Sequence, residues 1–522
     1  MRIRLIAVLL CGYLCMSAQT VIHIDNPDTW TTSEMSPYVG TTVTFDYPLY
    51  ITNNYSSSYY EVAPRRIFSP TNQAFPTTPE YNSIVSSNSS GVMRLYGLIS
   101  YHRTGERIVR LTARVDATNR LTLVGEADFD GNTREDMLEG HEDLGDYNVK
   151  VCAMNTEYYL VDNLGTGYGA DNETQLARQH TKLLNALAAV DADVYGLMEI
   201  EQGQAALNKM ASALSSRLGH TYAYINDGTA SSGSYTKVGY IYRSDRLTPY
   251  GQLLHIDNPS PQKRKKAAAF VLNENGEKFI FSLNHFKAKT GSASGDNADQ
   301  GDGQGSYNAT RVKEAQAVVN EAETMWKRYF ADDDVLVMGD LNAYAKEDPI
   351  KVFTDAGYAD LHRVFHADSS YSYSYRGAVG YLDHALANPS MLKQVTGMTA
   401  YHINSDERDA YTYDKSSDNT MFRSSDHDPI IVGLTLGGTG NAGLESFWEN
   451  PPVSHVITPA HPLVLQRAQG GRLRVYSLMG VMMLDKEITS DYYECQLNLP
   501  SGIYVVNVYG EAKVAQIKII VK

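Results

Sequence analysis

The sequence predicts an α/β protein in which sheets pack together with helices outside, flanked by two small all-β regions. Three observations lead to this fold class. Between about residues 147 and 436, apolar strand-like runs alternate with amphipathic helices, but without the regular βαβ repeat of a parallel sheet. Residues 20–145 and 455–522 instead hold short alternating runs separated by turn residues. A stretch rich in glycine, 437–454, is expected to be a flexible linker before the last region.

The composition is that of a globular protein, and its charge is acidic. The chain has 522 residues, of which 43% are hydrophobic and 20% are charged, so several domains are expected. The formal net charge of −15 excludes a protein that holds nucleic acid through bulk positive charge. It does not exclude a nuclease whose site is locally positive or bridged by a metal.

The first residues are typical of a secretory signal, expected to span residues 1–19. Arg2 and Arg4 form a charged start, Leu5 to Met16 an apolar core, and Ser17-Ala18 a small-residue cleavage site. The alternative, a membrane anchor, requires a longer apolar core. Only Cys152 and Cys495 follow this leader, so no disulfide framework is expected, as suits a secreted or surface-attached bacterial protein. No other stretch is apolar and long enough to span a membrane.

The N-terminal region, 20–145, is predicted to be a small β-domain. Its strand-like runs are Thr41–Phe45, Arg94–Ile99, Ile108–Leu111 and Leu121–Gly125. Its many tyrosines fit half-buried positions on pleated faces, or positions that stack rings or bases. The last region, 455–522, shows strands at Arg472–Tyr476, Leu497–Val506 and Val514–Val521.

The central region, 147–436, alternates strands and helices. Helices are predicted over Thr174–Ala189, Ala205–Leu218 and Arg311–Tyr329. Strands are predicted over Tyr147–Met154, Asp193–Met198, Val238–Tyr242, Ala267–Leu272, Phe279–Leu283, Val335–Met338, Tyr381–Leu386 and Pro429–Leu436.

Polar side chains stand where several of these strands end. Asp340 and Asn342 follow the apolar run Val335–Met338, and Glu199 follows Val194–Met198. A carboxylate at the end of a buried strand must face an opening, a partner or a metal, because burying it alone is too costly. Any one acid taken singly is better explained as a surface or capping residue, but the shared position of these acids after apolar strands favours a common site. Oxygen donors without a His- or Cys-rich spacing favour Mg²⁺ or a similar hard ion over Zn²⁺.

Histidines in the same positions provide acid–base chemistry. His285 directly follows the run Phe279–Asn284, and His427 lies between Asp426 and Asp428. A His beside a carboxylate is held in one tautomer and stays basic enough to accept a proton from water. The alternative for either His is a bond to a backbone carbonyl.

The motifs taken together resemble those of the endonuclease/exonuclease/phosphatase superfamily, in its branch of secreted bacterial nucleases. The similar segments, in chain order, are Gly196-Leu197-Met198-Glu199-Ile200-Glu201, Asn284-His285-Phe286-Lys287, Asp302-Gly303-Gln304-Gly305, Gly339-Asp340-Leu341-Asn342-Ala343-Tyr344, Gly380-Tyr381-Leu382-Asp383-His384 and Ser425-Asp426-His427-Asp428-Pro429. The resemblance implies a four-layer, DNase I-like sandwich. Relatives often have Cys and Trp where this chain has Ser306 and Tyr307, a departure in a loop outside the chemistry.

The resemblance also implies roles for single residues. Glu199 would be the main metal ligand with Asn155 and Asp426 close by, and Glu157 stands where some relatives keep an acidic ligand. His427 would be the general base, oriented by Asp383. Asp340 and Asn342 would orient water and phosphate, and His285 would donate to a phosphate oxygen or assist the leaving group. The ion would be Mg²⁺, with Mn²⁺ and Ca²⁺ as alternatives.

Five further residues are predicted to bind the substrate: Asn284, Arg311, Tyr242, Lys263 and Arg264. The last two belong to Lys263-Arg264-Lys265-Lys266, the strongest basic cluster of the sequence. A solvated loop and a phosphate-backbone contact both remain open for it.

The last region is similar to the C-terminal sorting domains of Bacteroidetes proteins exported by the type IX secretion system. Val475–Gly480 and Leu499–Val506 carry this resemblance, and an adhesion module is the alternative. The N-terminal region loosely resembles an OB-like module. The expected function is hydrolysis of extracellular DNA or RNA by a metal-dependent phosphodiesterase. The alternatives are a phosphatase or sphingomyelinase-like phospholipase of the same superfamily, or a non-catalytic surface adhesion protein.

Overall fold

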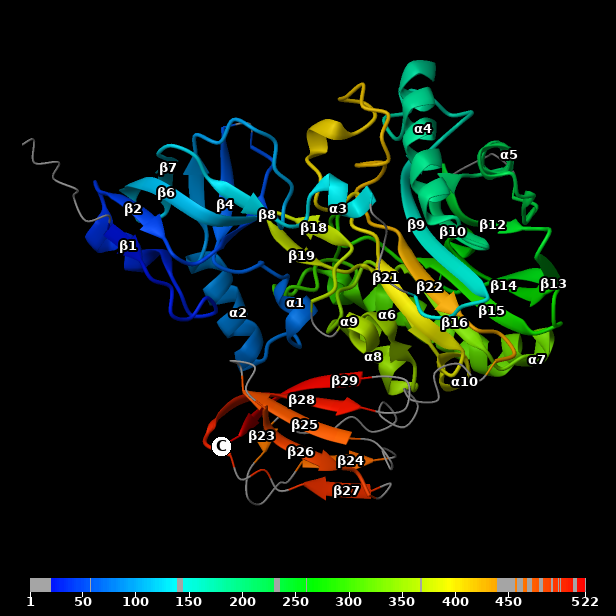
Figure 1. Cartoon of the computed structure of the whole chain (residues 1–522). Coiled ribbons are helices and arrows are strands. Elements are labelled where there is room, and N and C mark those ends of the chain that lie inside the picture. Colours follow the sequence, from blue (N-terminus) through cyan, green and yellow to red (C-terminus); the bar gives the residue numbers. More distant parts are fainter. Residues whose placement is uncertain are drawn as a thin grey trace, which may run out of the picture.

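The structure is a computed structural model of the whole chain (Figure 1). It describes residues 20–438, except 57, 139–143, 230–234, 260 and 367–368, and parts of the stretch 456–521. The predicted leader, 1–19, and nearly all of the predicted linker therefore lie outside the described residues. Within the described part, no helix combines the length and the apolar character that crossing a membrane requires.

The central region contains two six-stranded sheets. The first has the order β11-β12-β10-β9-β22-β21, with β9 and β10 parallel at its centre. Its strands are β9 (Val149–Tyr159), β10 (Val194–Glu201), β11 (Tyr222–Tyr224), β12 (Thr236–Arg243), β21 (Val395–Ala400) and β22 (Ile430–Leu434). The second has the order β13-β14-β15-β16-β20-β17, with β15 and β16 parallel at its centre. Its strands are β13 (Leu247–His255), β14 (Lys265–Leu272), β15 (Lys278–His285), β16 (Val335–Asp340), β17 (Ala359–Asp360) and β20 (Asp383–Ala387).

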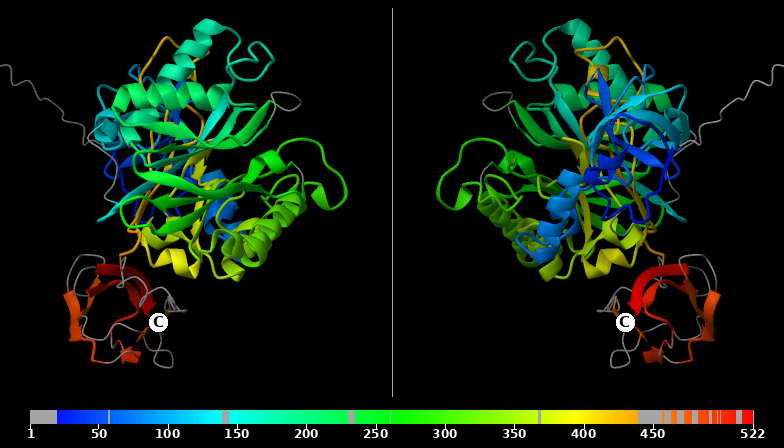
Figure 2. Two further views of the ribbon diagram at one scale, coloured as in Figure 1. Left: turned by 90° about the vertical axis from the view of Figure 1, so that its right-hand side faces the viewer. Right: turned by 90° about the vertical axis from the view of Figure 1, so that its left-hand side faces the viewer.

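The two sheets face each other across a shared apolar core. Side chains such as Val151, Met198, Phe281 and Met338 fill the space between them. The outer face of the first sheet packs on α4 (Glu173–Val190) and α5 (Ala205–Leu218), and that of the second packs on α6 (Asn308–Glu321) and α8 (Asp348–Asp355). Figure 2 shows the stacked sheets with helices above and below them. The predicted fold class, an α/β sandwich, is confirmed.

The predicted strands and helices of the central region are present with shifted ends, and the structure adds elements that were not predicted, among them strands β11, β13, β17 and β21 and helix α8. The helix predicted over Arg311–Tyr329 begins three residues earlier and contains a π-helical turn, Ala322–Trp326, before α7 (Lys327–Phe330). Short elements complete the region: η2 (Gln262–Arg264), η3 (Gly295–Asn297), α9 (Leu361–His366), β18 (Tyr373–Tyr375), β19 (Ala378–Gly380), α10 (Pro389–Leu392) and η5 (Asp409–Tyr411).

The N-terminal region is built on an eight-stranded sheet, but it also contains helices. Its strands are β1 (Thr20–Ile22), β2 (Thr42–Phe45), β3 (Leu49–Asn53), β4 (Tyr59–Ala63), β5 (Met93–Tyr96), β6 (Arg107–Ala117), β7 (Arg120–Leu123) and β8 (Asp128–Asp130). Helical segments are η1 (Thr32–Tyr38), α1 (Pro70–Gln73), α2 (Pro79–Ser90) and α3 (Arg134–Leu138). An all-β composition was the prediction, and it is corrected by α2. This helix has no buried residue, so its sequence carries no apolar periodicity to reveal it.

The C-terminal stretch forms one five-stranded sheet, β23-β29-β28-β25-β26, and the pair β24-β27. The strands are β23 (Val456–Ile457), β24 (Leu463–Gln466), β25 (Arg472–Ser477), β26 (Met482–Glu487), β27 (Tyr492–Cys495), β28 (Gly502–Tyr509) and β29 (Val514–Val521). The turn predicted at 478–480 lies outside the described residues.

Candidate active site

The strand directions bring the predicted polar residues to one end of the sandwich. Parallel strands β9, β10, β15 and β16 all deliver their C-terminal ends there. Strand β20 runs antiparallel to β16, so its first residue, Asp383, pairs with Asp340. Strand β22 runs antiparallel to β9, so the loop just before it, with Asp426 and His427, reaches the same end. We call Asn155, Glu199, His285, Asp340, Asp383, Asp426 and His427 the strand-end site.

Irregular backbone turns some of these side chains into the site. The pairing of β10 shifts between Leu197 and Ile200, and Glu199 at this bulge has a φ of 56°. On β9, Glu157 and Tyr158 also have positive φ values, of 50° and 55°. Side chains other than Gly rarely adopt this conformation, and such positions cluster at functional sites. The backbone N–H of Tyr158 donates to Oε2 of Glu199 at 3.2 Å, which joins the two irregular segments.

His427 is held by Asp383. Its Nδ1 lies 2.7 Å from Oδ2 of Asp383, which also accepts a hydrogen bond from the hydroxyl of Ser372. The other ring nitrogen, Nε2, lies 4.0 Å from Asp340 and 3.9 Å from Asp426. Burial alone would lower the pKa of His427, but the charges of Asp383, Asp426 and Asp340 raise it well above its usual value. The pair therefore fixes one tautomer and leaves Nε2 free to exchange a proton with a molecule in the site.

Asp340 is surrounded by polar groups from three strand ends. Its Oδ2 accepts from Nδ2 of Asn155 and from Nδ2 of Asn342, each at 3.3 Å, and lies 3.6 Å from Nε2 of His285. Burial and the charge of Arg264 lower the pKa of His285 well below its usual value, so this imidazole is neutral. A neutral imidazole can donate a hydrogen bond from one nitrogen to a substrate oxygen.

The oxygen atoms of the site fit a divalent cation. Burial, and then the charge of Asp426, raise the pKa of Glu199 to about 7 and that of Glu157 to about 8. Oε2 of Glu157 is buried and has no hydrogen-bond partner within the described part of the chain. Crowded carboxylates with an unpartnered oxygen are the hard donors that Mg²⁺ and related ions take. Ligand atoms of Asp340, Asp383 and His427 also lie within 4.8 Å of one another. Since Asp383 is hydrogen-bonded to His427, the carboxylate oxygens that could hold a cation are those of Glu157 and Glu199.

Three predicted substrate-binding residues are corrected by the structure. Arg311 is fully buried and donates to the backbone carbonyls of Lys287, Ser306 and Gln304, so it braces loops. Tyr242 pairs with Val194, which begins the strand whose other end carries Glu199, so it lies far from the site.

Asn284 precedes His285 on β15, and successive side chains of a strand point to opposite faces. It is fully buried and donates to the hydroxyl of Ser282. The side chain therefore faces away from the strand-end site.

The basic cluster divides into two halves. Lys265 and Lys266 are buried, and they pair with Glu314 and Asp227. Lys263 and Arg264 lie on η2 and remain partly exposed. Arg264 immediately precedes Lys265, which pairs with Asn284 next to His285, so Arg264 lies at the same end of the sheet as the strand-end site. Its positive charge acts on Glu199, His285 and Tyr158. Lys263 and Arg264 are thus the members of the cluster open to a phosphate, whereas Lys265 and Lys266 are not.

Sequence reasoning missed Arg423. This residue has a backbone φ of 57°. Its side chain is buried and donates a hydrogen bond to the backbone carbonyl of Asn404 at 3.2 Å. Burial alone would lower its pKa, but the charges of Glu157 and Asp426 raise it. The only available signal was its place three residues before Asp426.

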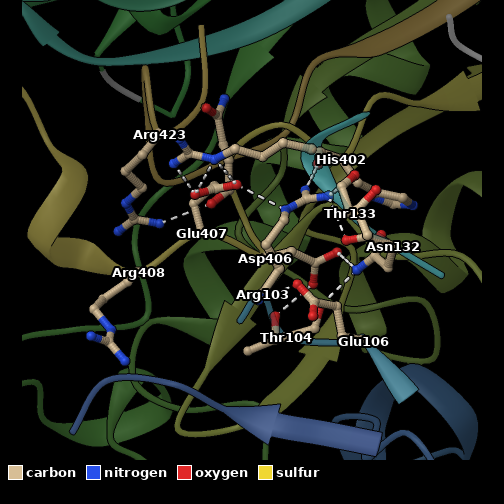
Figure 3. Close-up of polar contacts among 12 residues, drawn as sticks. Arg103, Thr104, Glu106, Asn132, Thr133, His402, Asp406, Glu407, Arg408 and Arg423 are labelled. Carbon is tan, nitrogen blue, oxygen red and sulfur yellow. Dashed lines mark hydrogen bonds and ion pairs between the residues drawn. The ribbon is translucent and has the colours of Figure 1, made fainter. Parts of the chain in front are cut away.

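The N-terminal region docks on the loop that leads to His427. Asp406 accepts hydrogen bonds from Arg66 and Thr104. Nε of Arg103 lies 2.8 Å from Glu407, and Figure 3 shows Thr104 beside Asp406 and Arg103 beside Glu407. Arg103 also donates to the carbonyl of His402, whose ring lies 2.9 Å from Asp428. The side chains of Asp406 and Glu407 are fully buried. Because Asp428 follows His427, the docked region supports the segment that carries the candidate base.

Comparisons with known proteins point to one family. The model described as "Endonuclease/Exonuclease/phosphatase family" matches residues 147–427, more than half of the chain. No curated protein matches the sequence.

Similar solved structures include an endonuclease/exonuclease/phosphatase from Bacteroides vulgatus, with 13% identity, 55% of this chain and 98% of that chain covered, and a TM-score of 0.38. The human Nocturnin catalytic domain with bound sulfate has 14% identity, 57% and 96% coverage and a TM-score of 0.38. A mannosyl-6-phosphatase from Bacteroides thetaiotaomicron has 18% identity, 55% and 100% coverage and a TM-score of 0.37. The family match spans every residue of the strand-end site, from Asn155 to His427, and the chain belongs to the endonuclease/exonuclease/phosphatase family.

Proposed function

We propose that this phosphoester hydrolase is a metal-dependent nuclease that cuts DNA or RNA without sequence specificity. The observation that carries the proposal is the pairing of His427 with Asp383, opposite the carboxylates of Glu157 and Glu199. Water attack on a phosphodiester requires a base for the water and positive charge for the phosphate oxygens. His427 with Asp383 supplies the base, and the carboxylates of Glu157 and Glu199 would hold the cation that supplies the positive charge.

The residues divide the work as follows. With a cation offsetting the carboxylate charge that raises the pKa of His427, Nε2 of His427 would accept a proton from the attacking water, while Asp383 holds Nδ1–H and balances the imidazolium that forms. Asp340, held by Asn155 and Asn342, orients that water, and the neutral His285 donates to a phosphate oxygen. The new bond joins the water oxygen to phosphorus, and the bond from phosphorus to the leaving oxygen breaks. A divalent cation, which we propose to be Mg²⁺, would offset the carboxylate charge and stabilise the charge that grows on the phosphate.

Surface side chains favour a substrate with rings over a lipid. Exposed tyrosines lie beside the site: Tyr168 stacks on Tyr158, and the pKa of Tyr55 is raised by burial and affected by the charges of Arg423 and Asp426. The fully exposed Ile99 belongs to the N-terminal region. A phospholipase would instead need an apolar loop that enters the bilayer.

Digestion of plasmid DNA and of RNA, with Mg²⁺ and then with excess EDTA, tests the proposal. We expect cutting with Mg²⁺, none with EDTA, and recovery when Mg²⁺ is restored. Glu199→Ala should reduce cutting, whereas Asp355→Ala, at an exposed ion pair on α8, should not. A preparation that cuts neither nucleic acid but releases phosphate from a sugar phosphate, or headgroups from a phospholipid, would contradict the proposal.

We also propose that the protein is exported, on the strength of its leader-like first residues, and that the C-terminal stretch serves as a sorting domain. The expected result is an extracellular form whose mass lacks residues 1–19 and the C-terminal stretch. Recovery of the full-length mass from the cell interior alone would refute export.

A further inference from the structure

Three tyrosines form a row at the end of the first sheet, in which Tyr168 contacts both of the others. The rings of Tyr158 and Tyr168 stack with centroids 4.9 Å apart and planes 28° from parallel. The rings of Tyr168 and Tyr235 follow at 6.1 Å and 41°. Tyr168 is 50% exposed and Tyr235 is 38% exposed, so part of this row of rings is open to solvent.

Buried hydrogen bonds and close backbone packing hold the loop of Tyr168 against Tyr158. Glu201, which is 1% exposed, accepts hydrogen bonds from the backbone of Val161, Asp162 and Asn163, at the start of the loop that carries Tyr168. Later in the loop, Gly169 lies so close to Tyr158 that a Cβ on it would come within 2.4 Å of the Tyr158 carbonyl oxygen. Tyr158 and Tyr168 are therefore preorganised, so little conformational entropy is lost when these rings bind a ligand.

The row begins at the reacting end of the site. The backbone N–H of Tyr158 donates to Glu199, and the preceding residue is Glu157. Arg264 precedes Lys265, which pairs with Asn284 next to His285, so it lies at this same end of the sheets. Its charge acts on both Tyr158 and Glu199, and its Nε is buried with no hydrogen-bond partner among the residues described. An aromatic surface, a free guanidinium donor and the candidate metal ligands thus adjoin one another.

We propose that Tyr158, Tyr168 and Tyr235 form a platform on which bases of single-stranded nucleic acid stack, with Arg264 contacting the backbone phosphate next to the scissile one. The platform rests on the proposed nuclease function and specifies its substrate. Aromatic side chains hold bases of any identity, because every base has a π face. A duplex hides those faces in its own stack, so the platform favours unpaired strands. The arrangement also suits an acidic protein, which cannot rely on bulk positive charge.

The test uses single-stranded oligodeoxynucleotides in which one interior residue is abasic, with cleavage at every linkage read on a sequencing gel. In wild type, we expect cleavage at linkages beside the abasic position to fall at least about fivefold relative to the other linkages. Tyr168→Ala and Tyr235→Ala should each weaken this contrast and raise KM for the normal strand, while Tyr168→Phe keeps both. Tyr250→Ala is the matched control, because Tyr250 is 41% exposed beside Lys278, at the end of β15 opposite His285.

The outcomes of this experiment distinguish the platform from the nuclease function. Equal cleavage beside the abasic position, with both alanine variants matching Tyr250→Ala, would overturn the platform and leave the nuclease function standing. A wild-type enzyme that cuts no oligonucleotide would refute the nuclease function itself. Faster cutting of duplex than of single strands would also overturn the platform, because paired bases cannot lie on it.

Discussion

At the scale of residues, the chemistry follows from where each side chain leaves its strand. Glu199, Asp340 and His285 were predictable because each ends an apolar run whose burial leaves a polar group only one exit. Asn284 was not, because it precedes His285 by one residue and so takes the other face of β15. As a polar residue next to His285, Asn284 is predicted from sequence to bind the substrate. The alternation of side chains along the strand instead turns it to the other face.

The environment of the Arg and Lys side chains was likewise not predictable from the sequence. Arg311, Lys265 and Lys266 read as substrate contacts or as a solvated patch, yet all three are buried with partners inside the fold. Nothing local distinguishes them from Arg264, because their partners Glu314 and Asp227 lie 49 and 39 residues away from the two lysines. Arg423, which does reach the site, was missed for the same reason.

At the scale of elements, the interface between the N-terminal region and the loop before β22 depends on buried ion pairs. The side chain of Arg103 is 1% exposed and that of Glu407 is fully buried. Removing one partner of such a pair leaves an uncompensated charge in the interior, which costs about 3–5 kcal/mol. Disrupting this interface is therefore expected to displace His427, because His402 contacts Asp428, the residue that follows His427.

Substitution of Glu407 by Ala tests this interface. We expect Glu407→Ala to lower the free energy of unfolding by about 3 kcal/mol or more and to reduce kcat, because Arg103 and Arg134 lose their acceptor. Asp355→Ala, which removes an exposed ion pair, should cost about 1 kcal/mol or less. Urea denaturation and steady-state kinetics give both quantities, and equal effects of the two substitutions would contradict the docking account.

The same interface gives a pH dependence with a defined sign. Burial alone would raise the pKa of Asp406, but Arg66, Arg103 and His402 lower it well below its usual value. Since its pKa in the folded protein is below the unfolded value of about 3.9, its stabilisation is present above about pH 4 and is lost as pH falls further. Wild type should therefore lose stability more steeply below pH 4 than Asp406→Asn does. Parallel curves for the two proteins would exclude Asp406 as the acid-sensitive group.

At the scale of the whole molecule, the α/β sandwich was predictable from the sequence, whereas the packing of the N-terminal region on the loop before β22 was not. Apolar runs such as Val335–Met338 and the helix face of α4 carry their own periodicity, so the alternation of strands and helices follows from local patterns. Contacts such as Arg66 with Asp406 join residues 340 apart, and no local pattern encodes them. The site assembles only when the two sheets and that loop come together.

The central claim is that His427, oriented by Asp383, is the base of a phosphodiester hydrolysis. Single-turnover cleavage of a labelled oligonucleotide at saturating Mg²⁺ tests it most directly, with folding of each variant checked by circular dichroism. We predict that His427→Ala slows cleavage by about 10²–10⁴-fold and Asp383→Ala by a comparable factor, since either change removes a positioned base. His220→Ala, at a partly exposed His beside α5, should match wild type. A His427→Ala rate within a few-fold of wild type would contradict the account.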